Sequence, residues 1–346
     1  MSLTIFTADE EKAIAEKPTL RHFVIFPALV LGMVMLAMEW PSGHMAWQCS
    51  LSLYTSAMLF CWMSCFHETA HQTLYRGPLL NVWLGRLIGT MIFVPYTVYR
   101  ETHIRHHAYL NKPTDWELWP YSDPKASLVF RRIYVWLDIF AGFLTTPFFY
   151  SRIYFHRDSP ITSPEVRRTI LLEYFGMLAV WLPALMACQH FGLWDSVGDA
   201  LLVPLMLGSM WQNLRKLTEH LGMASYDPLL GTRTVIGRTW WTRFCSFMNF
   251  DIFIHGVHHR HPRLAHNQLA EKMTDYQATH PEQDYPVFPN YMSATWNMLP
   301  HLLNPGCGVN AGASAKQVDD DPDIVNFVAD VTTEVVHADD DVVRAA

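Results

Sequence analysis

The chain has 346 residues, of which half are hydrophobic, 14% are aromatic and only 16% are charged, against about 25% charged in a typical soluble domain. Its net charge is −7, which provides no basic surface, so we expect no nucleic-acid partner. The six cysteines form no CxxC pair and no disulfide framework. Because the apolar residues are bunched into runs, the composition favours a bilayer protein over a soluble one with a large core.

Residues 1–21 form a polar arm that lacks the basic start and the small-residue cleavage site of a secretory signal. The first apolar run after it is therefore expected to remain as a membrane span. A span needs about 20 mostly apolar residues, and four runs approach this length: 23–40, 45–66, 170–188 and 197–212. The last is the weakest, because Asp199 interrupts its first turn.

Two further apolar stretches contain arginine, which is costly to bury in a bilayer. Residues 79–99 include Arg86, and residues 128–150 include Arg131 and Arg132. These stretches are predicted to be interfacial or re-entrant helices. The predicted fold is an all-α integral membrane protein with about four transmembrane helices, interfacial helices and a cytoplasmic cap rich in histidine.

The positions of the basic residues predict the orientation. The two short loops at 41–44 and 189–196 contain no Lys or Arg, and the 25 basic residues all lie elsewhere. The positive-inside rule then places both termini and the long central segment in the cytoplasm, and we expect a bacterial inner membrane. If the two arginine-containing stretches crossed as a pair, the count would be six with the same sidedness.

Histidines are numerous, 18 in all, and most of them are grouped with regular spacing. His67 and His71 form an HxxxH pattern directly after the second predicted span, and a single histidine, His220, follows the fourth. Two HxxHH patterns complete the set, and their members are His103, His106, His107, His255, His258 and His259. All nine positions lie on the predicted cytoplasmic side, so distant segments can meet at one membrane face.

The spacing suits metal ligation. His67 and His71 are four residues apart, so on a helix both rings leave the same face. In HxxHH, the first and second histidines are expected to share a face, while the adjacent third turns to a neighbouring metal ion. Nine imidazoles are too many for one ion and suit two ions with open positions, and imidazole suits iron, zinc and copper.

Carboxylates near the histidines could accept the other ring N–H and orient each ring. The sequence offers five such positions: Glu68, Glu101, Asp115, Glu219 and Asp251.

These histidine motifs resemble those of the membrane fatty acid desaturase family, in which HxxxH, HxxHH and H/QxxHH boxes follow one another. His67-His71, His103-His106-His107 and His255-His258-His259 match these boxes, and His220 resembles the additional ligand after the last span. The resemblance covers roughly residues 20–270. It implies a cytoplasmic centre of two iron ions, an acyl tunnel, O2 as oxidant and a fatty-acyl or lipid substrate.

The resemblance also implies a separate electron donor, a ferredoxin or a cytochrome b5-type protein, because the sequence contains no HPGG haem motif. One position departs from the stearoyl-type branch, where an asparagine stands four residues before the single histidine. Here that position is Lys216, and Asn213 is the nearest amide that could substitute through a water.

Two other functions stay open. Lipid or carotenoid hydroxylases of the same superfamily share the box spacing. His67-Glu68-Thr69-Ala70-His71 is also the HExxH pattern of zinc proteases, in which the glutamate acts as general base, although an intramembrane protease leaves seven histidines unexplained.

The remaining segments are predicted from composition. Residues 22–272 form the membrane di-iron domain, residues 273–317 an irregular extension of the cap, and residues 318–346 an acidic, disordered tail. Five histidines receive surface or structural roles: His261, His266, His280, His301 and His337.

Overall fold

The computed structural model describes residues 18–39, 44–75 and 77–313. Within these residues the protein is almost entirely helical, and the only strands are the two-residue β1 (Thr234–Val235) and β2 (Val287–Phe288), which pair in parallel. The acidic tail and most of the N-terminal arm lie outside the described residues. The prediction of an all-α membrane protein is confirmed by the elements below.

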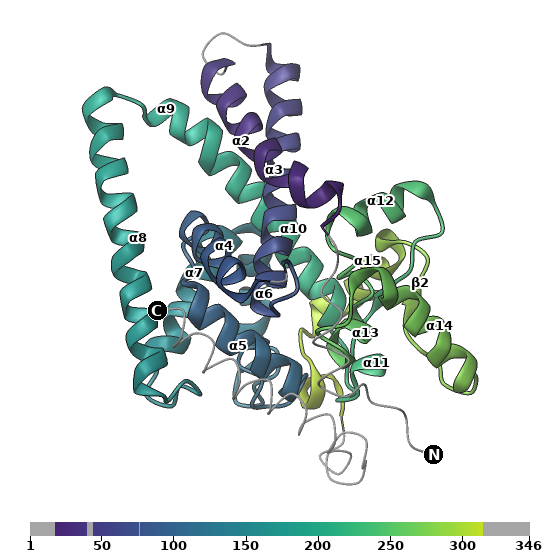
Figure 1. Cartoon of the computed structure of the whole chain (residues 1–346). Coiled ribbons are helices and arrows are strands. Elements are labelled where there is room, and N and C mark those ends of the chain that lie inside the picture. The colour runs from purple at the N-terminus through teal and green to yellow at the C-terminus, as the bar shows by residue number, and fades with distance from the viewer. Residues whose placement is uncertain (1–17, 40–43, 76, 314–346) are drawn as a thin grey trace.

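Two helical hairpins form the elongated part of the molecule, and both turn at the same end (Figure 1). The first pairs α2 (Leu20–Glu39) with α3 (Met45–Ala70). The second runs up α8 (Pro164–Phe191), turns after Gly192, whose φ of 67° is left-handed, and returns through the segment at 194–220.

The returning arm is one uninterrupted helical run made of three parts. Helix α9 (Trp194–Val197) leads into the π-helical turn η1 (Gly198–Leu202) and then into α10 (Val203–His220). Helix α3 is the central element, since it packs against α2, α4 and α10.

Three of the described helices, α2, α3 and α8, are each long and apolar enough to cross a bilayer. The predicted fourth span does not qualify as a single helix, because its apolar residues are divided among α9, η1 and the first half of α10. The second half of α10 is polar and carries the side chains described below.

The two arginine-containing stretches fold as sharply bent helix pairs. Helices α4 (Pro78–Met91) and α5 (Tyr96–Tyr109) meet at 106°, and α6 (Leu128–Phe140) and α7 (Gly142–Phe155) meet at 119°. Each pair adds one crossing if it is counted as a broken span, and none if it is re-entrant.

The three arginines that make these stretches costly to bury each have a hydrogen-bond partner. Arg86 Nε donates to Glu173 Oε1 at 2.9 Å, Arg131 donates to the Pro305 carbonyl, and Arg132 Nε donates to the Leu303 carbonyl at 2.6 Å. These contacts offset the cost of placing guanidinium groups beside apolar surface.

The cap is built from short helices that follow α10. They are α11 (Pro228–Gly231), α12 (Trp240–Met248), α13 (His255–Arg260), η2 (His266–Gln268), α14 (Leu269–Thr279), α15 (Tyr291–Met298), η3 (Leu299–Leu303) and η4 (Gly308–Ala311). The predicted irregular extension is thus partly helical, and α15 packs against α10 and β1.

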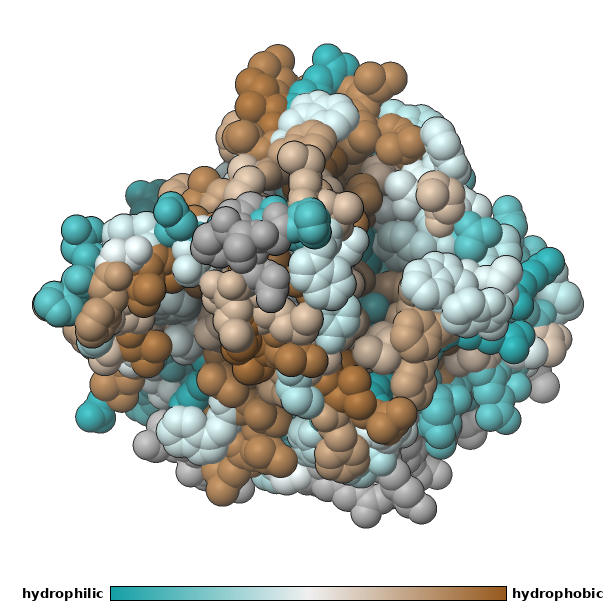
Figure 2. All heavy atoms as spheres, turned by 90° about the horizontal axis from the view of Figure 1, so that it is seen from above, coloured by the Kyte–Doolittle hydropathy of each residue, from teal (hydrophilic) through white to brown (hydrophobic). Residues whose placement is uncertain are grey.

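The exterior is unusually apolar. The most apolar window of α8 is only 11% buried, and large hydrophobic side chains on α2, α4, α6 and α8 are exposed. Figure 2 shows hydrophobic side chains over much of the face that carries the hairpin turns. A surface of this kind suits contact with lipid rather than water.

Candidate metal centre

The ends of α3 and α10 bring three of the histidines to the same level of the molecule. His67 lies in the last turn of α3, and His71 immediately follows it. His220 is the last residue of α10. Because both helices run away from the hairpin turns, their C-terminal ends meet below the elongated part, where α5 and α13 supply the other six histidines.

All nine histidines are buried, and their ring nitrogens converge into two neighbouring groups. The first group contains His67, His71, His103, His107 and His258, whose nitrogens all lie within 4.8 Å of one another. The second group contains His106, His220, His255 and His259. The rings of His107 and His259 stack with centroids 4.1 Å apart, so the two groups adjoin.

The prediction that the first and second histidines of each HxxHH pattern face the same metal ion was wrong. In α5, His103 and His107 enter the first group while His106 turns to the second, and in α13 His255 and His259 share the second group while His258 turns to the first. The reason is helical geometry. Residues four apart differ by about 40° around the axis, whereas residues three apart differ by about 60°.

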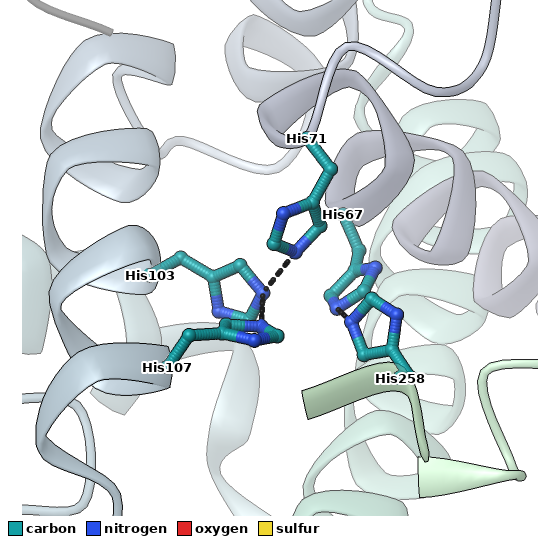
Figure 3. A group of neighbouring side chains, drawn as sticks. All are labelled: His67, His71, His103, His107 and His258. Carbon is teal, nitrogen blue, oxygen red and sulfur yellow. Dashed lines mark hydrogen bonds between the residues drawn. The ribbon is translucent and has the colours of Figure 1, made fainter. Parts of the chain in front are cut away.

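In the first group the Nε2 atoms face one another (Figure 3). His71 Nε2 lies 3.0 Å from His103 Nε2, which lies 3.2 Å from His107 Nε2. His258 Nε2 lies 3.1 Å from His67 Nε2.

The second group repeats this geometry. His255 Nε2 lies 2.8 Å from His220 Nε2 and 3.1 Å from His259 Nε2. The His106 ring packs against His220 and His259 with centroids 4.9 and 4.8 Å away.

Four of the rings have their tautomer set by an acceptor at Nδ1. The Nδ1–H groups of His67, His103 and His106 donate to Glu68 Oε1 at 2.8 Å, Glu117 Oε2 at 2.9 Å and Asp115 Oδ2 at 2.8 Å. His255 Nδ1–H donates to the Ile252 carbonyl at 3.2 Å. Carboxylates and carbonyls can only accept, so the ring proton lies on Nδ1 and a bare Nε2 lone pair points into each group.

Lone pairs that face one another at about 3 Å repel unless a cation lies between them. Six ligands about 2.1 Å from an ion are separated by about 3.0 Å along each edge of an octahedron, and the Nε2 separations of 2.8 to 3.2 Å match that edge. The donor set therefore suits a metal centre.

Burial lowers the pKa of His255, His258 and His259 well below the ordinary value, which favours their neutral rings. For His106 the carboxylates of Asp115 and Glu117 outweigh burial, and the pKa is raised. Burial alone would raise the pKa of Glu117, but the adjacent His103 outweighs it and lowers the pKa to about 2. Glu117 is therefore ionised and accepts strongly.

Glu68 lies close to the first group, and both of its carboxylate oxygens have partners. Oε1 accepts from His67, and Oε2 accepts from Thr73 Oγ1 at 2.6 Å and lies 2.9 Å from His266 Nε2.

Asp115 also has several partners. Besides His106, it accepts from the backbone N–H groups of Asn111, Glu117 and Leu118. Burial raises its pKa, although His106 opposes that change.

The other predicted partners have different neighbours. Glu101 pairs with Arg105 at 2.5 Å, and the Asp251 carboxylate contacts Arg21 at 3.4 Å and Ser246 at 2.9 Å. Asn213 Nδ2 donates to the Asp138 carbonyl at 2.6 Å. Lys216 Nζ donates to the Asp138 carboxylate at 2.7 Å. Glu219 lies beside the second group, with Oε2 3.6 Å from His255 Nε2.

Sequence reasoning missed Glu117 and His266. Glu117 follows Asp115 by two residues in the loop after α5, so the acidic pair near the second box was the available signal. His266 was given a surface or structural role, yet it is 2% exposed and reaches Glu68 from η2. No local pattern indicates that contact, because it joins residues about 200 positions apart.

A cavity opens beside both groups. Five histidines line one part of it: His67, His103, His106, His220 and His255. Apolar side chains from α3, α7 and α10 line other parts, among them Met63, Phe66, Phe143, Phe149 and Leu205. The cavity therefore has apolar walls directly beside the histidine groups, a lining that suits an apolar ligand.

The chain is similar in sequence to known acyl-lipid desaturases. The temperature-sensitive sn-2 acyl-lipid omega-3 desaturase (ferredoxin), chloroplastic, of Arabidopsis thaliana is 24% identical over 291 residues, which cover 76% of this chain and 62% of the relative. The sn-1 acyl-lipid omega-3 desaturase (ferredoxin) of Synechocystis sp. is 24% identical over 268 residues, 70% of this chain and 72% of the relative.

Several relatives extend well beyond the matched region. The chain covers only 49% to 62% of the length of four plant chloroplast relatives. The model of one family, described as fatty acid desaturase, matches residues 41–291, which include all nine histidines. This chain belongs to the fatty acid desaturase family.

Proposed function

We propose that the protein is a membrane di-iron oxidase that introduces a C=C bond into a fatty-acyl chain of a lipid. The observation that carries this proposal is the pair of all-histidine groups beside an apolar cavity. The overall reaction converts two adjacent CH2 groups, O2, two electrons and two protons into CH=CH and two molecules of water. The two iron ions, when bound, would supply the activation of dioxygen that removal of hydrogen from an unactivated carbon needs.

The protein's own residues have three tasks in this proposal. The nine histidines hold the ions, and Glu68, Asp115 and Glu117 orient His67, His106 and His103 through their Nδ1 atoms. Apolar side chains of α3, α7 and α10 hold the acyl chain beside the histidines and exclude water. Exclusion of water prevents side reactions at the metal centre.

A separate protein would supply the electrons. Two relatives from different organisms carry ferredoxin in their names, and we propose a ferredoxin or a cytochrome b5-type donor for this chain as well.

Four membrane crossings and a cytoplasmic site form part of the proposal. Helices α2, α3 and α8 and the continuous run at 194–220 give two hairpins, both of which turn at one end (Figure 1). The loops at these turns contain no Lys or Arg. Under the positive-inside rule the opposite end, with the histidines, faces the cytoplasm. We propose the same side for both termini, on the distribution of basic residues, and a bacterial inner membrane.

The surroundings of Glu68 argue against the zinc protease alternative. A general base needs an oxygen that can take a proton from a metal-bound water. Here Glu68 Oε1 accepts from the ring of its neighbour His67, and Oε2 is shared between Thr73 and His266. This carboxylate orients a ligand and is poorly placed to act as a base.

Lipid profiling tests the function. Membranes of a host that expresses the protein should contain fatty acids with one additional double bond, compared with an empty-vector control. His107→Ala should abolish this product because it removes a buried nitrogen of the first group, whereas His280→Ala should retain it because that half-exposed ring lies beside Glu282. Hydroxylated chains in place of unsaturated ones would show that the protein is a hydroxylase.

A further inference from the structure

The two histidine groups differ in the number of donors they offer. Five imidazoles converge in the first group and four in the second. The second group therefore offers one imidazole fewer than the first.

A carboxylate lies beside two of the four histidines of the second group. An oxygen of Glu219, together with the ligand nitrogens of His220 and His255, forms a cluster whose members all lie within 4.8 Å of one another. Glu219 Oε2 is 3.6 Å from His255 Nε2. The side chain also lines the cavity beside the two groups.

The direction of approach separates Glu219 from the other carboxylates near the histidines. Glu68, Asp115 and Glu117 reach their rings at Nδ1, the side that faces away from the group. Glu219 instead approaches Nε2 of His255, the atom whose lone pair points into the second group.

Glu219 also has unused bonding capacity. The residue is only 2% exposed, and within the described part of the chain its Oε1 atom has no hydrogen-bond partner. Its ion pair with Arg215 is long, 3.7 Å between Oε2 and Nε. A buried carboxylate oxygen without a partner is destabilising, and coordination of a cation would remove that cost.

We infer that the Glu219 carboxylate is a direct ligand of the metal ion in the second group, which makes the two donor sets five nitrogens and four nitrogens with one oxygen. This inference rests on the proposed metal centre. The alternative role for Glu219 is that of a counter-ion for Arg215, and the two roles predict different responses to substitution.

The test uses the full-length protein, purified in detergent, reconstituted anaerobically with ⁵⁷Fe(II) and then exposed to a moderate chelator. Iron per chain and the Mössbauer spectrum are measured. The wild type should keep about two irons in two environments, and Glu219→Gln should fall to about one, with the signal of the first group unchanged. Glu219→His should restore the second iron, because imidazole is also a good ligand for iron.

Arg215→Met is the matched control. It removes the ion pair and leaves the carboxylate in place, so it should keep about two irons if Glu219 is a ligand. Equal iron loss in Arg215→Met and Glu219→Gln, without rescue by Glu219→His, would show a counter-ion role and overturn the inference. Two irons with unchanged Mössbauer parameters in Glu219→Gln would also overturn it. If the wild type itself bound no iron, the proposed function would fail instead.

Discussion

Replacing Glu117 by alanine should weaken metal binding, although this residue is not itself expected to touch a metal ion. Its Oε2 accepts from His103 Nδ1 at 2.9 Å, and its Oε1 accepts from Tyr150 Oη at 3.2 Å. The Glu117 side chain is 13% exposed, so solvent screens these bonds only weakly. Without the carboxylate, the His103 ring loses the acceptor that keeps its proton on Nδ1 and its Nε2 free.

Loss of such a partner typically lowers metal affinity by about 10- to 100-fold, which corresponds to roughly 1.4 to 2.7 kcal/mol. We expect Glu117→Ala to fall within this range, because it leaves both His103 Nδ1 and Tyr150 Oη without their acceptor. Glu117→Gln should lower iron affinity less, by about tenfold or below. Its amide oxygen can still accept from His103, although a neutral acceptor forms a weaker bond than a carboxylate.

Competition with a chromophoric chelator in detergent measures the iron dissociation constant of each variant. Glu282→Ala serves as the matched control, because that glutamate is largely exposed and pairs only with His280 at 3.4 Å among its described contacts. If the iron dissociation constant of Glu117→Ala stayed within twofold of the wild-type value and the variant remained active, the proposed orientation of His103 by Glu117 would be refuted.

Three further outcomes are expected. Glu68→Gln and His266→Ala should each lower iron affinity and activity in part, because both disturb the contacts that orient His67. Complete loss of activity in Glu68→Gln, with iron retained, would instead favour the protease chemistry. Gly142→Val should reduce turnover of long acyl chains without loss of iron, because a β-carbon there would lie 2.1 Å from Asn213 Nδ2 in the cavity wall; an unchanged chain-length profile would refute this. Reporter fusions at Trp194 should read as external and at Lys125 as cytoplasmic, and a cytoplasmic reading at Trp194 would contradict the four-crossing arrangement.

Several properties of this protein follow from the sequence alone, because they depend on local spacing and composition. Apolar runs predict α2, α3 and α8, since a helix in lipid must present apolar side chains over the thickness of the bilayer. The three histidine boxes and His220 identify nine side chains that meet in the structure, because spacings of three and four residues put rings on one side of a helix.

The tertiary structure decided how those nine histidines are divided, because the division depends on how α3, α5, α10 and α13 are packed. The i,i+4 pairs stay together, and His106 and His258 each cross to the other group. Contacts between distant segments also escape any local pattern, as His266 and Glu68 show. The position of Glu219 beside Nε2 of His255 is of the same kind, since it arises only when the end of α10 meets α13.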